Sequence, residues 1–308
     1  MPIYLPIAEL PVNIFLILGL GLAIGFISGM FGIGGGFLMT PLLILLGIPP
    51  AVAVASVPSH MAAASFSGAY SYGRKRLLDM GLGLVLLSGA MLGTASGVWF
   101  FALLRRAGQL DLFIALAYII LLSVVGALTT AESVRAIARA WRGTPPILRR
   151  PGTHAWFHGL PLKLRFRQSR IYVSAIPITM IGFVAGFIGA VMGVGGGFLL
   201  VPALIYLMRV PTTVAVGTSL FLTLVTMLVA TVLHAVENRT VDAMLALVLM
   251  TGGVFGAQFG ARAGLAIRAE QLRLLLGLII IAVGVRVAAD LVNPPAELFS
   301  VVSKEIWE

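Results

Sequence analysis

Cysteine is absent from the sequence and charged residues are scarce. Only 10% of the 308 residues are charged, whereas 59% are hydrophobic; soluble domains carry roughly 25% charged residues. The lack of cysteine excludes disulfides, thiol catalysis and cysteine-bound metals. Apolar runs close to the ~20 residues of a membrane helix fill most of the chain. Because open strands cannot lie in lipid, the composition predicts an all-α polytopic membrane protein.

Acidic residues are also missing from the middle of the apolar segments. The acids next to these segments fall near their ends: Asp79, Asp111, Glu237, Asp242, Glu270 and Asp290. Proton- or sodium-coupled pumps usually need a buried carboxylate, so we expect no such coupling. The sequence also shows no nucleophile–base pair and no cluster of metal ligands. We therefore predict a protein that is not an enzyme and that uses no cofactor or metal.

Positive charge is concentrated in one stretch of the chain. The net charge is +10, and residues 132–170 hold nine of the arginines and lysines beside one acid, Glu132. A nucleic-acid patch is the alternative, but cytoplasmic loops of membrane proteins carry this excess and are attracted to anionic lipid. We predict a first transmembrane repeat over 1–131, a basic cytoplasmic loop over 132–170, a second repeat over 171–292 and a tail over 293–308.

An internal repeat relates the two halves. Gly25–Leu46 and Gly186–Leu207 are identical at 13 of 22 positions and lie 161 residues apart. The similarity continues beyond this motif, where Ser56 corresponds to Thr218 and Asp79 to Asp242. The two halves are therefore predicted to share one fold.

Each half contains five apolar segments that we predict to be helices. The first half has Val12–Phe31, Gly36–Gly47, Val52–Tyr70, Met80–Leu104 and Leu112–Thr129. The second half has Ile171–Met192, Gly197–Met208, Val214–His234, Ala243–Leu265 and Leu272–Leu291.

The second segment of each half is too short for an ordinary crossing. Gly36–Gly47 has 12 residues, about 18 Å of helix against a hydrocarbon core of roughly 30 Å. If it crosses, each half has five crossings, the repeats are inverted and both termini lie outside. If it is re-entrant, each half has four crossings, the repeats are parallel and both termini lie inside. Both arrangements satisfy the positive-inside bias, and the acidic C-terminal tail favours inverted repeats with interrupted helices.

A G-x-G-G-G break precedes each short segment. A dinucleotide-binding loop would need a preceding strand and a later acid, which are missing, and close helix packing is the other alternative. Free backbone N–H groups and the helix dipole at such a break can bind an anion, as broken helices do in transporters. The predicted substrate-binding residues of the breaks are Gly34, Gly35, Gly36, Gly195, Gly196 and Gly197.

Polar side chains follow each break at the start of the third segment. Hydroxyl groups in membrane helices often serve only as contacts between helices. His60 is exceptional, because ionisable groups within the membrane are costly and usually functional. The predicted side-chain contributions to the binding site come from Ser56, Ser59, His60, Thr218 and Ser219.

Glycines also recur at four-residue spacing in several helices. Such ladders are Gly21, Gly25 and Gly29, Gly89, Gly93 and Gly97, and Gly252, Gly256, Gly260 and Gly264. Small residues at this spacing let helix backbones approach closely in membranes. We therefore predict that these ladders are packing surfaces.

The doubled motif resembles that of a known family. Both halves carry G-x-x-x-x-x-x-G-x-G-G-G-F-L-x-x-P followed by P-x-x-x-A-V-x-S/T, and this pattern is similar to the TauE/SafE sulfite-exporter family over about 21–104 and 182–265. The resemblance implies a multi-pass transporter of the bacterial inner membrane with small sulfur-containing anions as substrates.

Together these features predict a transporter that exports a small sulfur-containing oxyanion, such as sulfite or a short organosulfonate. The alternatives are an importer of a related oxyanion or carboxylate and a non-transporting structural membrane protein. The predicted partners are the small anionic substrate and membrane lipids, without nucleic acid, and a homo-oligomer is compatible with the sequence.

Overall fold

The computed structural model describes residues 2–31, 35–141, 162–166, 168–169, 171–263 and 269–292. The first half comprises β1 (Pro2–Leu5), β2 (Leu10–Asn13), α1 (Ile14–Phe31), α2 (Gly36–Leu45), α3 (Pro50–Arg74), α4 (Met80–Arg106) and α5 (Leu110–Trp141). The second half comprises β3 (Lys163–Phe166), β4 (Ile171–Ser174), α6 (Ala175–Met192), α7 (Gly197–Pro202), the π-helix η1 (Ala203–Leu207), α8 (Thr212–Leu233), the π-helix η2 (His234–Asn238), α9 (Ala243–Ala263) and α10 (Ala269–Val292).

The predicted helical membrane architecture is confirmed. Each of the ten predicted segments corresponds to one of the helices α1–α10. Five helical stretches in the described part of the chain are long and apolar enough to cross a membrane: Met80–Arg106, Leu110–Ala131, Ala175–Met192, Thr212–Asn238 and Ala243–Gly260. The chain is therefore an integral multi-pass membrane protein.

Two features differ from the predicted segments. The first residues of the predicted helix Ile171–Met192 form strand β4 instead, because the β-branched Ile171 and Val173 pair with β3 in an antiparallel hairpin. A matching hairpin, β1–β2, precedes α1. Helix α5 also continues to Trp141, past the predicted boundary at residue 131, through a stretch rich in alanine and arginine, which favour helix.

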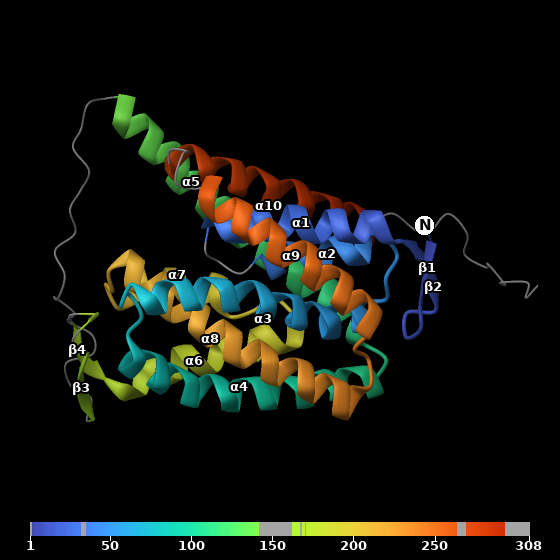
Figure 1. Cartoon of the computed structure of the whole chain (residues 1–308), viewed down its shortest axis with the longest axis horizontal. Coiled ribbons are helices and arrows are strands. Elements are labelled where there is room, and N and C mark those ends of the chain that lie inside the picture. The colour runs from blue at the N-terminus through green and yellow to red at the C-terminus, as the bar shows by residue number, and fades with distance from the viewer. Residues whose placement is uncertain are drawn as a thin grey trace, which may run out of the picture.

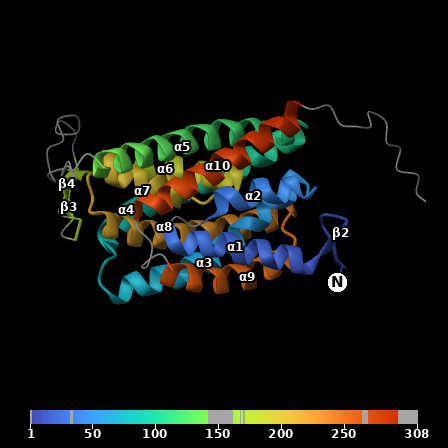
Figure 2. The same ribbon diagram turned by 90° about the horizontal axis from the view of Figure 1, so that it is seen from above.

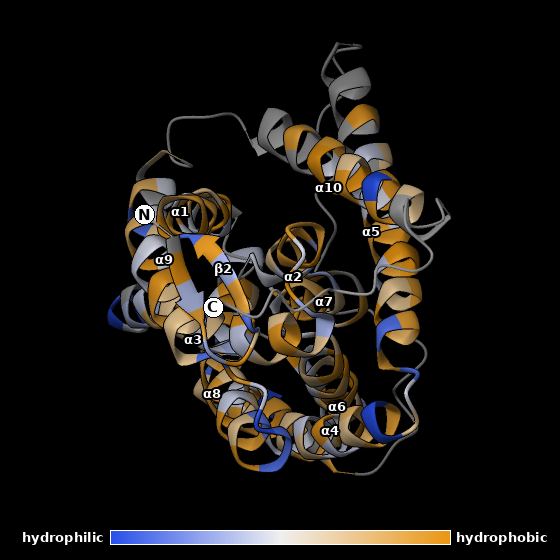
Figure 3. Cartoon of the chain, turned by 90° about the vertical axis from the view of Figure 1, so that its right-hand side faces the viewer, coloured by the Kyte–Doolittle hydropathy of each residue, from blue (hydrophilic) through white to orange (hydrophobic). Residues whose placement is uncertain are grey.

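The helices lie roughly along one axis, with the two hairpins at opposite ends of the bundle (Figure 1). These are called the β1–β2 end and the β3–β4 end below. Helix α1 packs on α9, α4 on α6, α3 on α8, and α5 on α10, and the last pair runs along one flank in Figure 2. Figure 3 looks along the bundle and shows α2 and α7 near its centre.

Glycine ladders hold the two tightest helix pairs together. A Cβ atom on Gly21 of α1 would lie 2.9 Å from the Leu249 carbonyl oxygen of α9. A Cβ atom on Gly97 of α4 would lie 2.7 Å from the Phe187 carbonyl oxygen of α6. Both values are closer than ordinary contact, so only glycine permits this packing. The predicted role of the ladders is confirmed for the glycines that the structure describes.

Candidate functional site

The two glycine-rich breaks interrupt the helices as predicted. Gly35 precedes α2 in the left-handed conformation, with φ of 57°. In the second half, Gly193 and Gly195 have φ of 66° and 71° between α6 and α7. Glycine adopts this conformation without the steric cost that a Cβ atom brings. Gly34 lies outside the described residues.

The short helices that follow the breaks meet inside the bundle. The rings of Phe37 in α2 and Phe198 in α7 lie 5.7 Å apart between centroids, and both side chains are buried. They are corresponding residues of the repeat, 161 positions apart. The starts of α2 and α7, which are corresponding elements of the two halves, therefore face one another.

Met61 of α3 lies against both breaks. A Cβ atom added to Gly36 would overlap the Met61 sulfur, and one added to Gly195 would overlap its terminal methyl group. The Met61 side chain is fully buried. Sequence reasoning missed this residue, because a methionine in an apolar helix has no distinguishing signal. Its flexible thioether fills the space between the two breaks.

Six buried side-chain atoms lack a hydrogen-bond partner among the described residues: His60 Nε2, Ser65 Oγ, Thr94 Oγ1, Thr130 Oγ1, Thr223 Oγ1 and Thr240 Oγ1. His60 and Ser65 lie on α3 with Met61, and these two side chains and Thr223 are each at most 1% exposed. Thr223 borders the second break, since its methyl group lies 3.4 Å from where a Gly195 Cβ atom would be. Buried polar groups are normally paired, because an unpaired one costs about 1–3 kcal/mol. An unpaired buried hydroxyl beside the second break is suited to a polar ligand.

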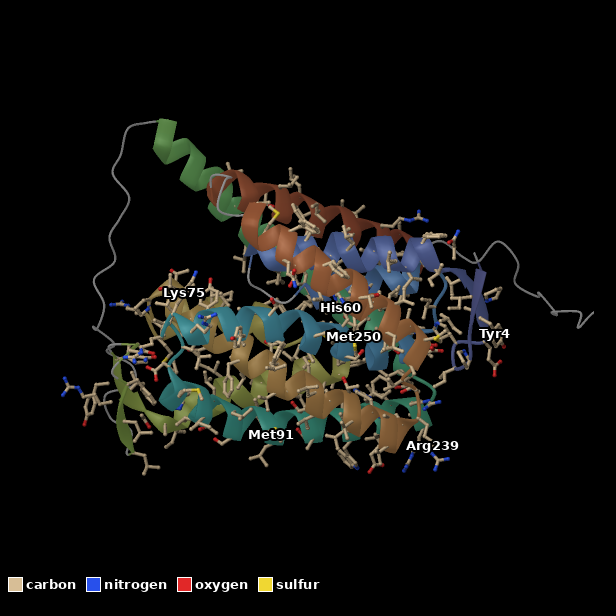
Figure 4. The ribbon with its side chains drawn as sticks, in the orientation of Figure 1. Tyr4, His60, Lys75, Met91, Arg239 and Met250 are labelled. Carbon is tan, nitrogen blue, oxygen red and sulfur yellow. The ribbon has the colours of Figure 1, made fainter. Side chains whose placement is uncertain are left out.

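His60 is held by its other ring nitrogen. Its Nδ1 atom lies 2.7 Å from the Leu249 carbonyl oxygen of α9. A carbonyl oxygen can only accept, so we infer that Nδ1 carries the proton and that Nε2 of the neutral ring is an acceptor. The ring packs against Gly253, where a Cβ atom would overlap it, and Figure 4 shows it within the bundle at the contact of α3 and α9.

The other predicted side chains bond within the protein. Ser59 donates to the Ser56 carbonyl oxygen at 2.6 Å, and Ser219 donates to the Val216 carbonyl oxygen at 3.0 Å. Both bonds stay within one turn of the helix that carries the serine. The structure thus places the predicted Gly36 and Gly195 against Met61, and His60 one residue before it on α3, whereas these two serines make local contacts.

Ser56 and Thr218 contact the starts of helices from the opposite half. Ser56 Oγ accepts the Asp242 backbone N–H at 3.0 Å, and Thr218 Oγ1 accepts the Asp79 backbone N–H at 3.2 Å. Asp242 precedes α9 at the β1–β2 end, and Asp79 precedes α4 at the β3–β4 end. The two bonds join corresponding residues of the two halves.

The same aspartates cap their helices and bind the hairpins. Asp242 accepts the Leu245 N–H at 3.1 Å and the Ile7 N–H at 2.9 Å. Asp79 accepts the Leu82 N–H at 3.2 Å and the Ser169 N–H at 2.9 Å. Side-chain caps of this kind satisfy the unpaired donors of a first helical turn. The Asp79 cap and the Asp242 cap each join a hairpin to the bundle.

Two polar residues of the first half contact the break of the second half. Tyr118 of α5 donates its hydroxyl to the Met192 carbonyl oxygen at 2.5 Å. Thr40 of α2 donates to the Gly193 carbonyl oxygen at 3.4 Å. These bonds satisfy carbonyl groups that the end of α6 leaves free. Sequence reasoning missed both residues, although each is a polar side chain within an apolar segment.

The second buried histidine is fully paired. His234 Nε2 lies 3.0 Å from the Ala190 carbonyl oxygen, and its Nδ1 lies 3.0 Å from Asn238 Nδ2. The ring also meets Phe101 edge to face at 4.8 Å between centroids. His234 is thus a packing residue, and His60 differs from it by its unpaired nitrogen. Within the described ranges, no group of three or more His, Cys, Asp or Glu side chains could hold a metal.

The chain is similar to curated membrane transporters. "Probable membrane transporter protein YunE" of Bacillus subtilis is 27% identical over 273 residues, covering 86% of this chain and 93% of that protein. A "Probable membrane transporter protein" of Xylella fastidiosa is 29% identical over 283 residues, covering 89% of this chain and 95% of that protein. No solved structure matches the chain.

The family comparison covers most of the sequence, including both glycine breaks and all of α2–α9. The family model described as "Sulfite exporter TauE/SafE" matches residues 17–287. The matched range includes both halves of the internal repeat. The chain is therefore a membrane transporter that belongs to the TauE/SafE sulfite exporter family.

Proposed function

We propose that the protein exports a small sulfur-containing oxyanion, either sulfite or a short organosulfonate. The observation that carries this proposal is the unpaired, buried Thr223 hydroxyl group beside the second glycine break, together with the unpaired atoms of His60 and Ser65 on the same helix as Met61. A transporter needs a polar site inside an apolar bundle, and His60, Ser65 and Thr223 offer one. The family membership supplies the substrate class.

The breaks bind the anion through the backbone. The first N–H groups of a helix have no intrahelical acceptor, and the helix dipole adds positive potential there. Gly36 begins α2 and Gly197 begins α7, without a side-chain cap on either helix. Of the predicted residues, the proposed site keeps Gly34, Gly35, Gly36, His60, Gly195, Gly196 and Gly197, and Met61 and Thr223 are added from their contacts with the breaks. Ser56 and Thr218 are left out because they bond to helix starts at opposite ends of the bundle, and Ser59 and Ser219 because their hydroxyl groups bond within their own helices.

The two halves are proposed to be inverted repeats. Helix α1 follows the hairpin at the β1–β2 end, whereas its counterpart α6 follows the hairpin at the β3–β4 end (Figure 1). The caps support opposite directions, because α9 begins at the first end and its counterpart α4 at the second. Lys75 and Arg76 follow α3, and Lys163 and Arg165 lie in β3, all at the β3–β4 end. The positive-inside bias therefore places that end in the cytoplasm.

The membrane potential drives the anion outward. A bacterial interior is negative, so the export of one negative charge gains about 2.3 kcal/mol per 100 mV. Outward flux then needs no coupled cation. The two most buried carboxylates near the helix starts, Asp79 and Asp242, are occupied as caps, which agrees with transport that uses no carboxylate for coupling.

Purified protein in proteoliposomes tests this function. Sulfite, sulfate, thiosulfate, taurine and sulfoacetate are first compared for thermal stabilisation of the detergent-solubilised protein. Flux of the stabilising anion is then measured under an imposed potassium-diffusion potential. We expect flux that carries net charge and persists after proton and sodium gradients are collapsed. Strict dependence on either gradient, or accumulation against the potential, would favour an importer instead.

A further inference from the structure

A long groove runs along the outer surface of α3. One part has a volume of about 640 Å³ between α3, α8 and α9, and is bordered by Ser59, Ala63 and Val232 among others. A second part of about 590 Å³ continues to the β3–β4 end and reaches Arg76 and Gln168. The two parts adjoin, since the same three residues border both: Phe66, Tyr70 and Leu224.

The dimensions of the groove match one leaflet of a bilayer. Ser59 and Gly73, the outermost lining residues within α3, are 14 residues apart, which is about 21 Å of helix. Half of a bilayer that is about 40–45 Å thick with its headgroups is about 20–22 Å. The lining is mostly alanine, leucine, valine and aromatic side chains, and Phe66 and Tyr70 are more than 60% exposed. An acyl chain of one lipid therefore fits along it.

The groove ends at three consecutive basic residues. Arg74, Lys75 and Arg76 close α3 and are all exposed, and the Arg74 guanidinium lies 6.0 Å from the centre of the Tyr70 ring. Asp79, the nearest acid in the sequence, is buried and accepts hydrogen bonds from Leu82 and Ser169. Figure 4 shows Lys75 at the end of the bundle opposite Arg239. The positive charge therefore lies where a lipid headgroup would be.

We propose that this groove is a binding site for one anionic phospholipid, with an acyl chain along α3 and its phosphate at Arg74, Lys75 and Arg76. Arginine and lysine near the membrane surface attract anionic lipids by about 1 kcal/mol per residue. Tyr70 lies at the level where aromatic rings border headgroups. The bound lipid would fill the outer side of the contact between α3, α8 and α9, whose inner side carries Met61 and His60.

Native mass spectrometry of the full-length protein tests the site. The protein is extracted from vesicles containing equal parts of phosphatidylglycerol and phosphatidylethanolamine, and the retained lipids are counted. We expect the wild type to retain one phosphatidylglycerol molecule, in clear preference to phosphatidylethanolamine. The triple variant Arg74→Gln/Lys75→Gln/Arg76→Gln is expected to lose that preference at least tenfold. Ala63→Phe, which fills the apolar part, is expected to reduce retention of both lipids.

A matched control removes charge at the opposite end. Arg106→Gln/Arg239→Gln changes two basic residues at the β1–β2 end, outside the groove, and is expected to retain phosphatidylglycerol as the wild type does. Far-ultraviolet circular dichroism checks that each variant is folded. Equal retention of the two lipids by the wild type would overturn the proposal. Equal loss in the triple variant and the control would also overturn it, since the preference would then be a general effect of charge.

Discussion

The ends of the bundle and its centre use the repeat in opposite ways. At the two ends, the Asp79 cap and the Asp242 cap make equivalent bonds: each receives a hairpin N–H, and each donates its own N–H to a hydroxyl at the start of α8 or α3. At the centre, three pairs of corresponding positions differ in chemistry: His60 and Leu222, Met61 and Thr223, and Thr40 and Val201. The ends are symmetric and the centre is not.

This difference separates the scaffold from the site. Caps must satisfy the same unpaired N–H groups, and glycine ladders must allow the same close helix contacts, in both halves, so both halves keep the same residues. The centre binds one substrate, for which two identical sets of side chains are not needed. Of the three unpaired side chains His60, Ser65 and Thr223, the first two belong to the first half and lie on α3, whereas Thr223 belongs to the second half. We therefore expect changes at the centre to alter transport, and equivalent changes at the two ends to alter stability by similar amounts.

Valine at either break should have the largest effect. Gly35→Val and Gly195→Val are expected to abolish anion flux, because a β-branched residue with positive φ costs about 1–3 kcal/mol and overlaps Ser28 or Met61. Gly19→Ala is the control, since no atom lies within 4 Å of its added Cβ, and normal flux is expected. Flux is measured in proteoliposomes alongside the melting temperature. A folded Gly35→Val protein with normal flux would refute the role of the break.

Replacing His60 by leucine makes the centre symmetric, since leucine is the corresponding residue of the second half. Nε2 of the neutral His60 ring can only accept, so it would bind a protonated oxyanion such as hydrogensulfite through the hydroxyl of that anion. A hydrogen bond to a charged group is worth about 1.5–3 kcal/mol, so His60→Leu is expected to weaken binding of such an anion roughly tenfold or more. Binding is measured by titration calorimetry with the anion that stabilises the protein.

His234→Leu is the paired control for this change. It leaves the Ala190 carbonyl oxygen and the Asn238 amide without their partner, so it should cost about 1–3 kcal/mol of stability and leave anion affinity unchanged. If His60→Leu instead bound the anion normally, His60 would be a packing residue of the same kind as His234.

Thr223→Val removes an unpaired hydroxyl while keeping the shape of the side chain. We expect affinity for the anion to fall roughly fivefold, equivalent to about 1 kcal/mol, with no loss of stability. Thr226→Val is the control, because the Thr226 hydroxyl already donates to the Leu222 carbonyl oxygen at 2.8 Å. The affinity of this variant for the anion should equal that of the wild type. Equal affinities in the two variants, measured by the same titration, would exclude Thr223 from the site.

The smallest effect on flux is expected at the ends. Asp79→Ala and Asp242→Ala each remove a helix cap, which costs typically about 1 kcal/mol, and the two losses should be similar. Chemical unfolding in detergent measures them. A large difference between the two variants, or a loss of flux in only one without loss of stability, would contradict the symmetric role of the caps.

The scaffold was more predictable than the site. Hydropathy and the repeat identified ten helical segments, both breaks and the packing ladders, because these depend on local composition and spacing. The hairpins were missed, since Pro2–Asn13 and Lys163–Ser174 are short and lie outside or at the edge of apolar segments. Which polar atoms remain unpaired depends on distant partners: the residue that holds His60 is 189 positions away. Sequence alone therefore could not separate Thr223 from Thr226, or find Met61.

The most direct test of the central site locates the anion itself. Selenite has the shape and charge of sulfite, and its selenium scatters X-rays anomalously. Crystals grown with selenite are predicted to show an anomalous peak beside the starts of α2 and α7, within hydrogen-bond distance of His60 Nε2 or Thr223 Oγ1. The Met61 side chain should be displaced from its position between Gly36 and Gly195. A peak found only at the basic β3–β4 end, with Met61 unmoved, would contradict the account.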